Sequence, residues 1–523
     1  MTNYILFDKI VFVKICLLES QTRGKCFFFA AIDLKAREWR TNMLLYNSLS
    51  RTREEFVPRF DGKVSMYTCG PTVYHFAHIG NLRTYTMEDV LEKYLRYIGY
   101  DVTRVMNITD VGHLTSDGDT GEDKMLKGAR REHKTVLEIA QFYTDAFFAD
   151  CKKLNIKMPD VIEPATNCIP EFITMVSELL EKGFAYEAGG NIYFDTAKLK
   201  TYYVFNDFNS DDLEVGVRDG VEEDGNKRNK ADFVLWFTKS KFEDQELKWD
   251  SPWGVGYPGW HIECSCIARK HLGEYLDIHC GGIDNAFPHH TNEIAQSESA
   301  FGHDWCKYWF HVHHLNTNSG KMSKSSGEFL TVSLLEEKGY DPLIYRFFCM
   351  QSHYRKNLVF SWENLDNART AYGKLISRIA ALTPSDKDTV DEAAFAEGKK
   401  RFTDALDNDL NTALAVTALY DVFKLKTNDA TKLALIKDFD TVLSLGLISA
   451  ADAVNKAREE EKKAATPDVS AELLAYINEK IEARRAAKAA KNYAEADAIR
   501  AELTAKGITL IDTKAGTEFT IEK

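Results

Sequence analysis

The sequence predicts an α/β protein built on a Rossmann-like doubly wound parallel sheet. The first observation is a strand, a glycine-containing loop, a helix and a second strand in close succession, at 64–68, 76–81, 83–98 and 102–108. The second is the return of this β/α pattern at 259–284, and the third is a helical spacing of apolar residues after 363. In such sheets the ligand lies at the carboxyl ends of the strands, so we expect the functional residues there.

The first 42 residues differ from the rest of the chain. They show neither a helical nor an alternating period, and they hold too many acidic residues for a transit peptide. A natural-looking start comes at Met43, followed by a strand-like opening and a turn at Asp61-Gly62. We expect residues 1–42 to be an upstream extension outside the fold, or a misassigned start.

The later elements divide the rest of the chain. A helix at about 167–183, short strands such as 191–194 and a charged loop at 218–232 predict an inserted α+β subdomain. Apolar residues spaced for helices at 363–382 and 395–450 predict a helical bundle. The expected parts are the sheet domain at 43–159 and 256–320, the insert at 160–255, a lysine-containing loop region at 321–362, the bundle at 363–455, a charged linker at 456–465 and a small C-terminal unit at 466–523.

The composition excludes several classes of protein. With 44% hydrophobic residues in 523, the chain has the material for large cores, which excludes a wholly disordered or fibrous protein. No stretch approaches the roughly 18–20 uncharged apolar residues of a membrane helix. Ten cysteines are too sparse for a disulfide scaffold, and no secretory signal precedes them, so we expect a cytoplasmic protein. The net charge of −13 argues against wholesale coating of nucleic acid but leaves room for a local basic surface.

Two motifs are suited to binding phosphate. His75 and His78, with Gly80 and Asn81, lie in the loop between strand and helix, where backbone N–H groups and the helix dipole favour an anion. Two lysines in the string KMSKS at 321–325 stand on a Ser/Gly-rich loop and can neutralise a pyrophosphate. An ordinary βα turn and a solvated basic loop are the alternatives, but the two motifs together favour a nucleotide triphosphate.

A third group of residues is suited to binding metal. His289 and Glu293 are four residues apart on an expected helix that begins at Pro288, so both can reach one ion. Thiolates could come from Cys69 and Cys264, both expected at carboxyl ends of neighbouring strands, and this donor set suits Zn²⁺ better than Mg²⁺ or Ca²⁺. The alternatives are that both cysteines are buried small hydrophobes, or that Cys266 is the second thiolate.

The C-terminal unit has a local basic surface. Five basic residues and one acid between 480 and 491 give a local charge of +4 on an acidic protein. Tyr493 can stack on an unpaired base, and Asp497 and Asp512 can accept hydrogen bonds from base edges. A surface helix with a charged face is the alternative interpretation.

These motifs carry a resemblance to a known family. HIGN at 78–81 and KMSKS at 321–325 resemble the two signatures of class I aminoacyl-tRNA synthetases. The cysteinyl-tRNA synthetases in particular are similar in the strings CGPTVY at 69–74, GYPGWHIECS at 256–265, FPHHTNEIAQSE at 287–298, DALDNDLNTALA at 404–415 and KNYAEADAIRAEL at 491–503. The similarity runs from about Met43 to the C-terminus.

The resemblance implies a set of roles. It implies one zinc ion per chain, held by Cys69, Cys264, His289 and Glu293, that binds the sulfur of the substrate L-cysteine. Catalytic positions match His75, His78, Lys321 and Lys324, and ATP, with Mg²⁺, would be bound by His78, Gly80, Asn81, Asp284 and Lys324. Thr109, Trp260 and His279 match the amino-acid pocket. Anticodon contacts to tRNA(Cys) match Lys488, Tyr493, Asp497 and Asp512 in unit 466–523, while 321–362 would contact the acceptor stem.

The resemblance also leaves alternatives. Cys280 stands where the family often has Gly or Thr, and Asn81 where many class I enzymes have His. A ligase that transfers activated cysteine to an amino sugar would lack the last unit, and a catalytically dead zinc- or RNA-binding protein would usually have lost one of the signature residues. We expect a monomer that has no contact with membranes and ligates cysteine to tRNA(Cys) through a cysteinyl-adenylate.

Overall fold

The computed structural model describes residues 3–7, 10–14, 42–111, 135–205, 224–239, 246–317, 320–321, 329–465, 471–513 and 516–521. The chain divides into two compact units. Unit 1 comprises Met1–Leu375 and Leu382–Leu447, and unit 2 comprises Ile376–Ala381 and Ile448–Lys523. None of the helices described is both long and apolar enough to cross a membrane.

Unit 1 is centred on a five-stranded parallel sheet with the strand order β13-β12-β5-β6-β7. β5 (Lys63–Thr68), β6 (Asp101–Ile108) and β7 (Val161–Pro164) run outward on one side, and β12 (Leu276–Gly282) and β13 (Cys306–Val312) on the other. The strand order therefore reverses between β5 and β12, and open parallel sheets bind their ligands at such a reversal. The expected doubly wound sheet is confirmed.

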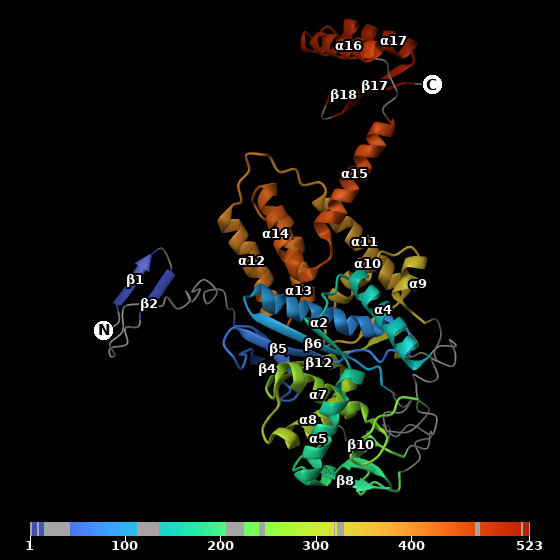
Figure 1. Ribbon diagram of the computed structural model, residues 1–523. Helices are drawn as coiled ribbons and strands as arrows, with labels where there is room; N and C mark the ends of the chain where they lie inside the picture. Colours follow the sequence, from blue (N-terminus) through green and yellow to red (C-terminus); the bar gives the residue numbers. More distant parts are fainter. Residues whose placement is uncertain are drawn as a thin grey trace, which may run out of the picture. The chain divides into compact units, whose positions relative to one another are not determined.

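The strand-helix-strand unit is present as β5, α2 (Ile79–Tyr97) and β6. α2 begins at Ile79, before the predicted start near 83, because the His78 side chain accepts a hydrogen bond from the backbone N–H of Asn81 and caps the helix. Figure 1 shows α2 on one face of the sheet and α7 (Trp260–Leu272) and α8 (Thr291–Phe301) on the other. The HIGN string is thus the cap and first turn of a helix.

The region predicted as an insert provides three strands of a four-stranded antiparallel sheet of order β11-β10-β9-β8, and β11 lies just after it. Its strands are β8 (Ala185–Ala188), β9 (Asn191–Phe194), β10 (Phe233–Phe237) and β11 (Tyr257–Pro258). The predicted strand at 191–194 is confirmed, and the predicted helix at about 167–183 is α5 (Ile169–Glu181), preceded by a 3-10 turn at Ala165–Cys168. Residues 218–223 of the predicted charged loop lie outside the described residues.

A three-stranded sheet of order β15-β14-β16 follows β13. β14 (Leu315–Thr317) pairs antiparallel with β15 (Gly320–Lys321) and parallel with β16 (Leu358–Phe360). The helices α9 (Val332–Glu337) and α10 (Pro342–Met350) separate β15 from β16 in the chain. Residues 322–328, which hold most of the KMSKS string, lie outside the described residues.

The predicted helical region after 363 is confirmed. Its helices are α11 (Trp362–Ile379), α12 (Glu392–Asp407), α13 (Thr412–Asp421), α14 (Asp429–Leu443) and α15 (Leu447–Ala465). The charged segment 456–465, expected as a linker, is helical and forms the last part of α15. Its Ala, Glu, Lys and Arg residues have high helix propensity, which accounts for the continuation.

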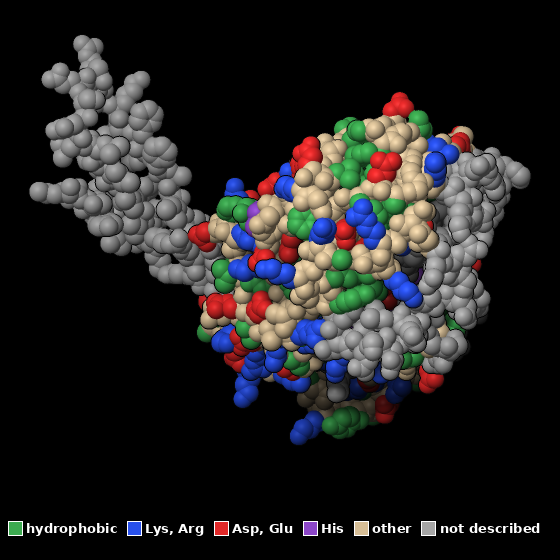
Figure 2. All heavy atoms as spheres, turned by 90° about the horizontal axis from the view of Figure 1, so that it is seen from below, with side chains coloured by type: hydrophobic (Ala, Val, Ile, Leu, Met, Phe, Trp, Pro, Cys, Tyr) green, Lys and Arg blue, Asp and Glu red, His purple; other side chains and the backbone are tan. Residues whose placement is uncertain are grey.

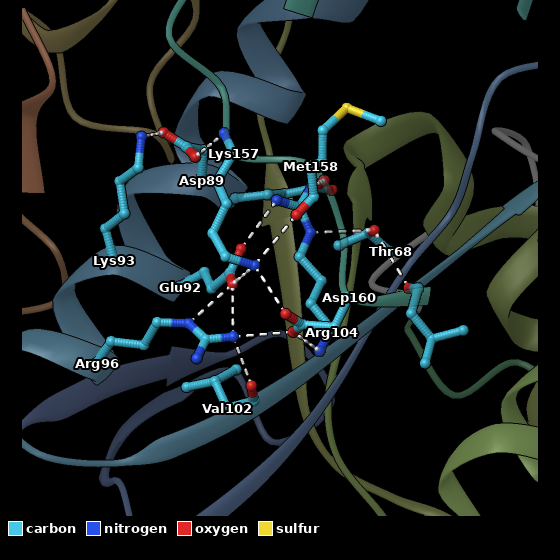
Figure 3. A network of polar contacts seen from close by, with 12 residues as sticks. Thr68, Asp89, Glu92, Lys93, Arg96, Val102, Arg104, Lys157, Met158 and Asp160 are labelled. Carbon is cyan, nitrogen blue, oxygen red and sulfur yellow. Dashed lines mark hydrogen bonds and ion pairs between the residues drawn. The ribbon is translucent and has the colours of Figure 1, made fainter. Parts of the chain in front are cut away.

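A network of charges joins α2 to β6 in the interior of unit 1 (Figure 3). The buried carboxylate of Glu92 on α2 lies 3.2 Å from Arg104 of β6 and 2.9 Å from both Arg96 and Lys157. Asp160 extends the network through contacts with Arg96 at 2.8 Å and Lys157 at 2.9 Å. Since each charged group has an opposite charge close by, the network offsets the desolvation of Arg104 and Glu92.

Asp409 ties distant parts of unit 1 together. Its buried carboxylate accepts hydrogen bonds from the backbone N–H of Tyr46 at 2.9 Å, from the Tyr354 hydroxyl at 2.5 Å and from Arg355 Nε at 2.7 Å. Tyr46 belongs to the hairpin of β3 (Leu44–Asn47) and β4 (Thr52–Glu55). This carboxylate thus holds the hairpin against residues more than 300 positions later.

The last residues of unit 2 form a small α+β module of their own. It consists of α16 (Ala471–Ala489), α17 (Tyr493–Ala505) and an antiparallel hairpin of β17 (Ile508–Thr513) and β18 (Gly516–Ile521). Its core is a cluster of buried aliphatic side chains: Ile477, Ile499, Leu503, Ile508 and Leu510.

The N-terminal residues contain a regular element that the sequence did not predict. β1 (Asn3–Phe7) and β2 (Ile10–Lys14) pair antiparallel, with Phe7 opposite Ile10. Both segments are rich in β-branched and aromatic residues, which favour strands even without alternation.

One face of the molecule shows how the charge is distributed. In Figure 2, Lys and Arg side chains lie among Asp and Glu side chains over the coloured residues and do not gather by sign. The net charge of −13 therefore does not produce a uniformly acidic surface on this face.

Candidate functional site

A cavity of about 340 Å³ opens where the strand order reverses. Its lining comes from the loop after β5, the end of β6, the start of α7, the end of β12 and the segment after β13. Many of the residues predicted from the sequence are among those that line it: Cys69, His75, His78, Gly80, Asn81, Thr109, Trp260, Cys264, Asp284 and His289.

Four predicted metal ligands converge beside this cavity. One donor atom from each of Cys69, Cys264, His289 and Glu293 lies within 4.8 Å of all the others, and all four residues are buried. His289 Nε2 lies 3.0 Å from Glu293 Oε1 and 3.5 Å from Cys264 Sγ, and the two Sγ atoms are 3.9 Å apart. A tetrahedral zinc shell with Zn–S bonds of about 2.3 Å separates two sulfurs by roughly 3.8 Å, so these donors fit a zinc ion.

The position of Cys264 differs from the prediction. Cys69 follows β5, as expected, but Cys264 lies on helix α7 and not at the carboxyl end of a strand. The preceding strand β11 has only two residues, and the helix begins directly after Gly259. The expected placement of Cys264 was wrong because the pattern of residues 260–272 is equally compatible with a buried strand and a buried helix.

A second set of donors overlaps the first. Cys69, His279, His290 and Glu293 also bring four donor atoms within 4.8 Å of one another, and all are buried. His290 Nε2 lies 3.2 Å from Cys69 Sγ, and His290 Nδ1 lies 2.8 Å from His311 Nε2. The adjacent histidines at 289 and 290 were visible in the sequence, but only the structure brings His290 to the same cysteine.

Cys266 and Cys280, the other two thiols noted in the sequence, are not part of this cluster. The Cys266 thiol contacts the Glu171 carbonyl and the Met175 sulfur, both at 3.6 Å, and Cys280 is completely buried. Burial raises the pKa of both thiols well above the usual value. Neither belongs to a donor set found among the described residues, and neither has the exposed thiolate that makes a cysteine reactive.

The protonation of the cluster is set by burial and by its own charges. Burial raises the pKa of the Cys69 thiol to about 11 and that of Cys264 well above its usual value. Burial also opposes charge on His289 and Glu293, but nearby charges prevail: Glu293 raises the pKa of His289 to about 10, and His279 and His289 lower the pKa of Glu293 to about 2. A metal ion must therefore displace protons from these thiols and from this imidazole to bind.

Outer contacts fix the orientation of the ligands. His279 Nε2 lies 2.8 Å from the second carboxylate oxygen of Glu293. The ring of Trp260 stacks on His289 with centroids 4.2 Å apart, and His261 Nδ1 lies 3.0 Å from His289 Nδ1. Of the predicted substrate residues, Trp260 and Thr109 line the cavity, whereas His279 is buried behind Glu293.

Thr109 is held by its neighbours at the cavity wall. Its hydroxyl donates to Glu263 Oε2 at 2.7 Å and accepts from Asn107 Nδ2 at 3.1 Å. Asn107 in turn accepts from the backbone N–H of Gly70 at 2.7 Å. No pattern in the sequence singles out Asn107 or Glu263, because only the packing of β6 against α7 brings them together.

Three of the HIGN residues, His78, Gly80 and Asn81, line the cavity. His78 Nδ1 accepts the Asn81 backbone N–H at 3.1 Å, so the neutral imidazole carries its proton on Nε2 and presents a donor. Asp284 also lines the cavity, and its carboxylate lies 3.0 Å from His314 Nε2. The backbone of Lys321 belongs to β15, while Lys324 lies outside the described residues.

The predicted RNA-contacting residues lie in the C-terminal module. Tyr493 at the start of α17 is 63% exposed, and Asp497 on the same helix is exposed. Asp512 accepts two hydrogen bonds from Arg484, at 2.8 and 2.9 Å, and one from Lys488 at 2.9 Å. These bonds lower the pKa of Asp512, so its carboxylate already has partners within the module.

Comparison with known proteins gives consistent matches. The family described as "tRNA synthetases class I (C) catalytic domain" matches residues 55–370. The chain is 45% identical over 499 residues to "Cysteine--tRNA ligase" of Treponema denticola, covering 91% of this chain and 99% of that protein. It is 43% identical over 488 residues to "Cysteine--tRNA ligase" of Borrelia garinii subsp. bavariensis, covering 91% and 98%.

One solved structure can be set beside these sequences. Methionyl-tRNA synthetase of Mycobacterium tuberculosis in complex with methionyl-adenylate aligns with a TM-score of 0.49 at 16% identity, covering 74% of this chain and 91% of that one.

Proposed function

The chain belongs to the cysteinyl-tRNA synthetases of class I, and from this we propose that it ligates L-cysteine to tRNA(Cys) at the expense of ATP. The single observation that carries the proposal is the convergence of the donor atoms of Cys69, Cys264, His289 and Glu293 beside a cavity that His78, Gly80 and Asn81 also line. One site can thus hold a thiol and a nucleotide side by side. A cysteinyl-adenylate is the intermediate that this arrangement supports.

Zinc is the metal that suits the four ligands best, with one ion per chain. Two thiolates, an imidazole and a carboxylate favour it over Mg²⁺ or Ca²⁺. When bound, it would supply a Lewis-acidic position that a thiolate fills better than a serine hydroxyl. Discrimination by a bond that the competitor cannot make reaches about 10⁴–10⁵-fold, a range in which no editing site is needed.

The residues of the chain orient the substrates for the first step. Thr109 and Trp260 form the wall next to the ligands, which suits them to hold the amino acid with its carboxylate toward ATP. His78 at the N-terminus of α2 presents an Nε2 donor, and His75 lines the same cavity. Both can therefore donate hydrogen bonds to phosphate oxygens of the Mg²⁺ complex of ATP. We assign Gly80, Asn81 and Asp284 to the nucleotide and Lys321 and Lys324 to the pyrophosphate, where point charges on flexible stems stabilise the leaving group.

The second step transfers the cysteinyl group to the terminal adenosine of tRNA. Positioning and electrostatic stabilisation suffice here, because the adenylate already has a good leaving group in AMP. We assign recognition of the anticodon to Lys488, Tyr493 and Asp497, with Asp512 fixing Lys488 and Arg484 in the same module. The exposed ring of Tyr493 is suited to stacking on an unpaired base.

The proposed function also suggests a role for each part of the chain, an oligomeric state and a cellular compartment. We propose the catalytic domain at 43–159 and 256–320, the connective insert at 160–255, the KMSKS and stem-contact region at 321–362, the bundle at 363–455, the linker at 456–465 and the anticodon-binding unit at 466–523. A monomer in the cytoplasm, where translation takes place, accords with this function.

The experiment that tests the function is ATP–pyrophosphate exchange with each of the twenty amino acids, followed by aminoacylation of tRNA(Cys). We expect exchange with cysteine alone and transfer to tRNA(Cys). Exchange with a different amino acid would refute the substrate assignment. Exchange with cysteine but transfer to an amino sugar and not to tRNA would identify the alternative acceptor.

A further inference from the structure

Arg83, on the second turn of α2, is a completely buried arginine with unusual partners. Among the described residues, every hydrogen bond of its guanidinium goes to a backbone carbonyl. Nη1 donates to the carbonyls of His313 and His314, both at 2.6 Å, and Nη2 donates to those of Lys356 at 2.6 Å and His353 at 3.4 Å. Burying a guanidinium without a carboxylate is costly, so these carbonyls must carry its stabilisation.

The four carbonyls belong to two segments that meet beside the cavity. His313 and His314 connect β13 to β14, and His353 and Lys356 precede β16. The segments are also bonded to each other, since the His313 N–H donates to Tyr354 and the Leu358 N–H donates to His314. Arg83 therefore joins α2 to the starts of two parallel strands, β14 and β16, in one place.

A second contact joins the same helix to the same region. The Ile79 N–H in the first turn of α2 donates to the Leu330 carbonyl at 2.9 Å, and the Tyr345 hydroxyl of α10 donates to the Ile79 carbonyl at 2.6 Å. The turn that carries His78 is thus held from two directions. Its position is coupled to the sheet β15-β14-β16 and to α10.

The segment that Arg83 holds is part of the cavity wall. His313, His314 and Leu315 all line the cavity, and His314 lies 3.0 Å from the carboxylate of Asp284. His78, Gly80 and Asn81, at the start of the helix that carries Arg83, line the same cavity, and Gly80 lies next to Leu315. A shift between α2 and the 313–315 segment would therefore change the width of the nucleotide part of the cavity.

We propose that Arg83 is a positioning residue for ATP: by bonding four carbonyls it fixes the distance between the HIGN turn and the wall formed by His313, His314 and Leu315. The inference rests on the proposed function, because it takes this part of the cavity as the nucleotide site. Lysine cannot replace the guanidinium, because its three donors radiate from one nitrogen and cannot serve two segments as a planar fork does.

The chain offers a matched control in Arg346. It is equally buried, and it donates to the carbonyls of Leu443 at 2.7 Å and Leu154 at 2.9 Å and to Asp89 at 2.6 Å. None of these partners lines the cavity. Arg346→Lys should therefore disturb packing to a similar degree as Arg83→Lys without moving the wall of the nucleotide site.

The test compares both variants with the wild type in cysteine-dependent ATP–pyrophosphate exchange. Since misplacement by about 1 Å can cost a factor of roughly 10², we expect Arg83→Lys to raise the KM for ATP about 10- to 100-fold. The KM for cysteine and the bound zinc should be unchanged, and Arg346→Lys should leave both KM values within about twofold while lowering Tm. Equal effects of the two variants, or equal changes in the two KM values, would overturn the proposal.

Two further measurements keep the inference testable. If Arg83→Lys does not fold, Tyr345→Phe, which removes the hydroxyl bond to Ile79 together with a contact to the Cys349 thiol, should raise the KM for ATP by roughly 2- to 5-fold; an unchanged KM would then overturn the proposal. Calorimetric titration of the wild type and Arg83→Lys with a non-hydrolysable ATP analogue needs no amino acid. A wild type without cysteine-dependent exchange but with binding weakened by Arg83→Lys would refute the proposed function and leave the role of Arg83 standing.

Discussion

His279 Nε2 lies 2.8 Å from one carboxylate oxygen of Glu293, although the two residues come from different elements, β12 and α8. The other oxygen of Glu293 faces Cys69 and His289, at 4.0 and 3.0 Å. His279 therefore determines which oxygen of Glu293 faces the proposed metal position. Contacts of this kind orient a ligand without touching the ion.

We predict that His279→Gln weakens zinc binding about 10- to 100-fold, the usual cost of losing such a contact. The affinity can be measured by competition with a chromophoric chelator. His303→Gln is the control, because His303 lies outside both donor sets and pairs with Glu274. Zinc affinity equal to that of the wild type in His279→Gln would show that Glu293 is oriented by other means.

Cys264→Ser should lose or weaken a stoichiometric zinc ion, because a hydroxyl is a poorer zinc ligand than a thiolate. Cys266→Ser is a matched control two residues along the same helix, since its thiol contacts Glu171 and Met175 instead. Zinc per chain can be counted by atomic emission. A metal-free wild type that still selects cysteine over serine in exchange would refute the role given to the ion.

Tyr493→Ala should raise the KM for tRNA(Cys) by about 5- to 100-fold, since stacking on one base is worth roughly 1–3 kcal/mol. Lys488→Ala should act in the same direction, because it removes a positive charge and one partner of Asp512. Cysteine-dependent exchange should be unchanged in both. Tyr493→Phe keeps the ring and should behave as the wild type; a defect as large as that of alanine would rule out stacking as the main contribution.

The buried carboxyl group of Glu88 should make the stability of the fold depend on pH. It is completely buried, neither carboxylate oxygen has a hydrogen bond in the described part of the chain, and Arg104 at 3.6 Å is shared with Glu92. Burial raises the pKa of Glu88 to about 8, and Arg104 only partly opposes this. Because the desolvation of Glu88 outweighs the attraction of Arg104, this carboxyl stays protonated near neutral pH.

The raised pKa sets the direction of the effect. Below the unfolded pKa near 4.5 the carboxyl is neutral in both states, and as pH rises from there to about 8 only the unfolded state releases its proton, so stability falls. We expect Glu88→Gln to match the wild type near pH 5 and to exceed it at pH 8.5 by on the order of 2–4 kcal/mol. Urea unfolding at the two pH values measures the difference; a constant difference would show that Glu88 does not titrate in this window.

A chain that begins at Met43 should keep exchange activity and Tm. Met43 is buried, and its carbonyl accepts the Phe56 N–H at 2.7 Å, so the described fold from this residue onward closes on itself. Removal of β3 as well should lower stability by at least about 2 kcal/mol, because Asn47 donates to the Lys307 carbonyl and accepts from the Trp309 N–H. Thermal unfolding of both truncated chains measures these differences in stability. A chain that begins at Met43 and has no exchange activity would show that the first 42 residues have a role.

The sequence predicted those parts of the fold and site that depend on local patterns. Periodicity located β5, α2 and β6, and the rule that ligands lie at the carboxyl ends of parallel strands pointed to Cys69. Spacing of four residues paired His289 with Glu293 on one helical face, and the structure brings their donor atoms to 3.0 Å.

The remaining features depend on packing between distant segments. The placement of Cys264 on a helix was missed because a short buried segment has no period that separates strand from helix. His290, in the turn before α8, reaches His311 of β13 only through tertiary packing. The pairing of Asp512 with Arg484, 28 residues apart, likewise results from the return of β17 along α16 and has no local pattern.

The carboxylate of Asp409 has a consequence for biosynthesis. Its partner Tyr46 is made 363 residues earlier, so at about 5–20 residues per second the ribosome needs roughly 20–70 s between the two. Until Asp409 is made, the Tyr46 N–H lacks this partner, although Asn47 of the same hairpin can already bond to Lys307 and Trp309. The rate of translation therefore sets the earliest time at which Asp409 can bind the hairpin, in a protein whose relatives serve translation.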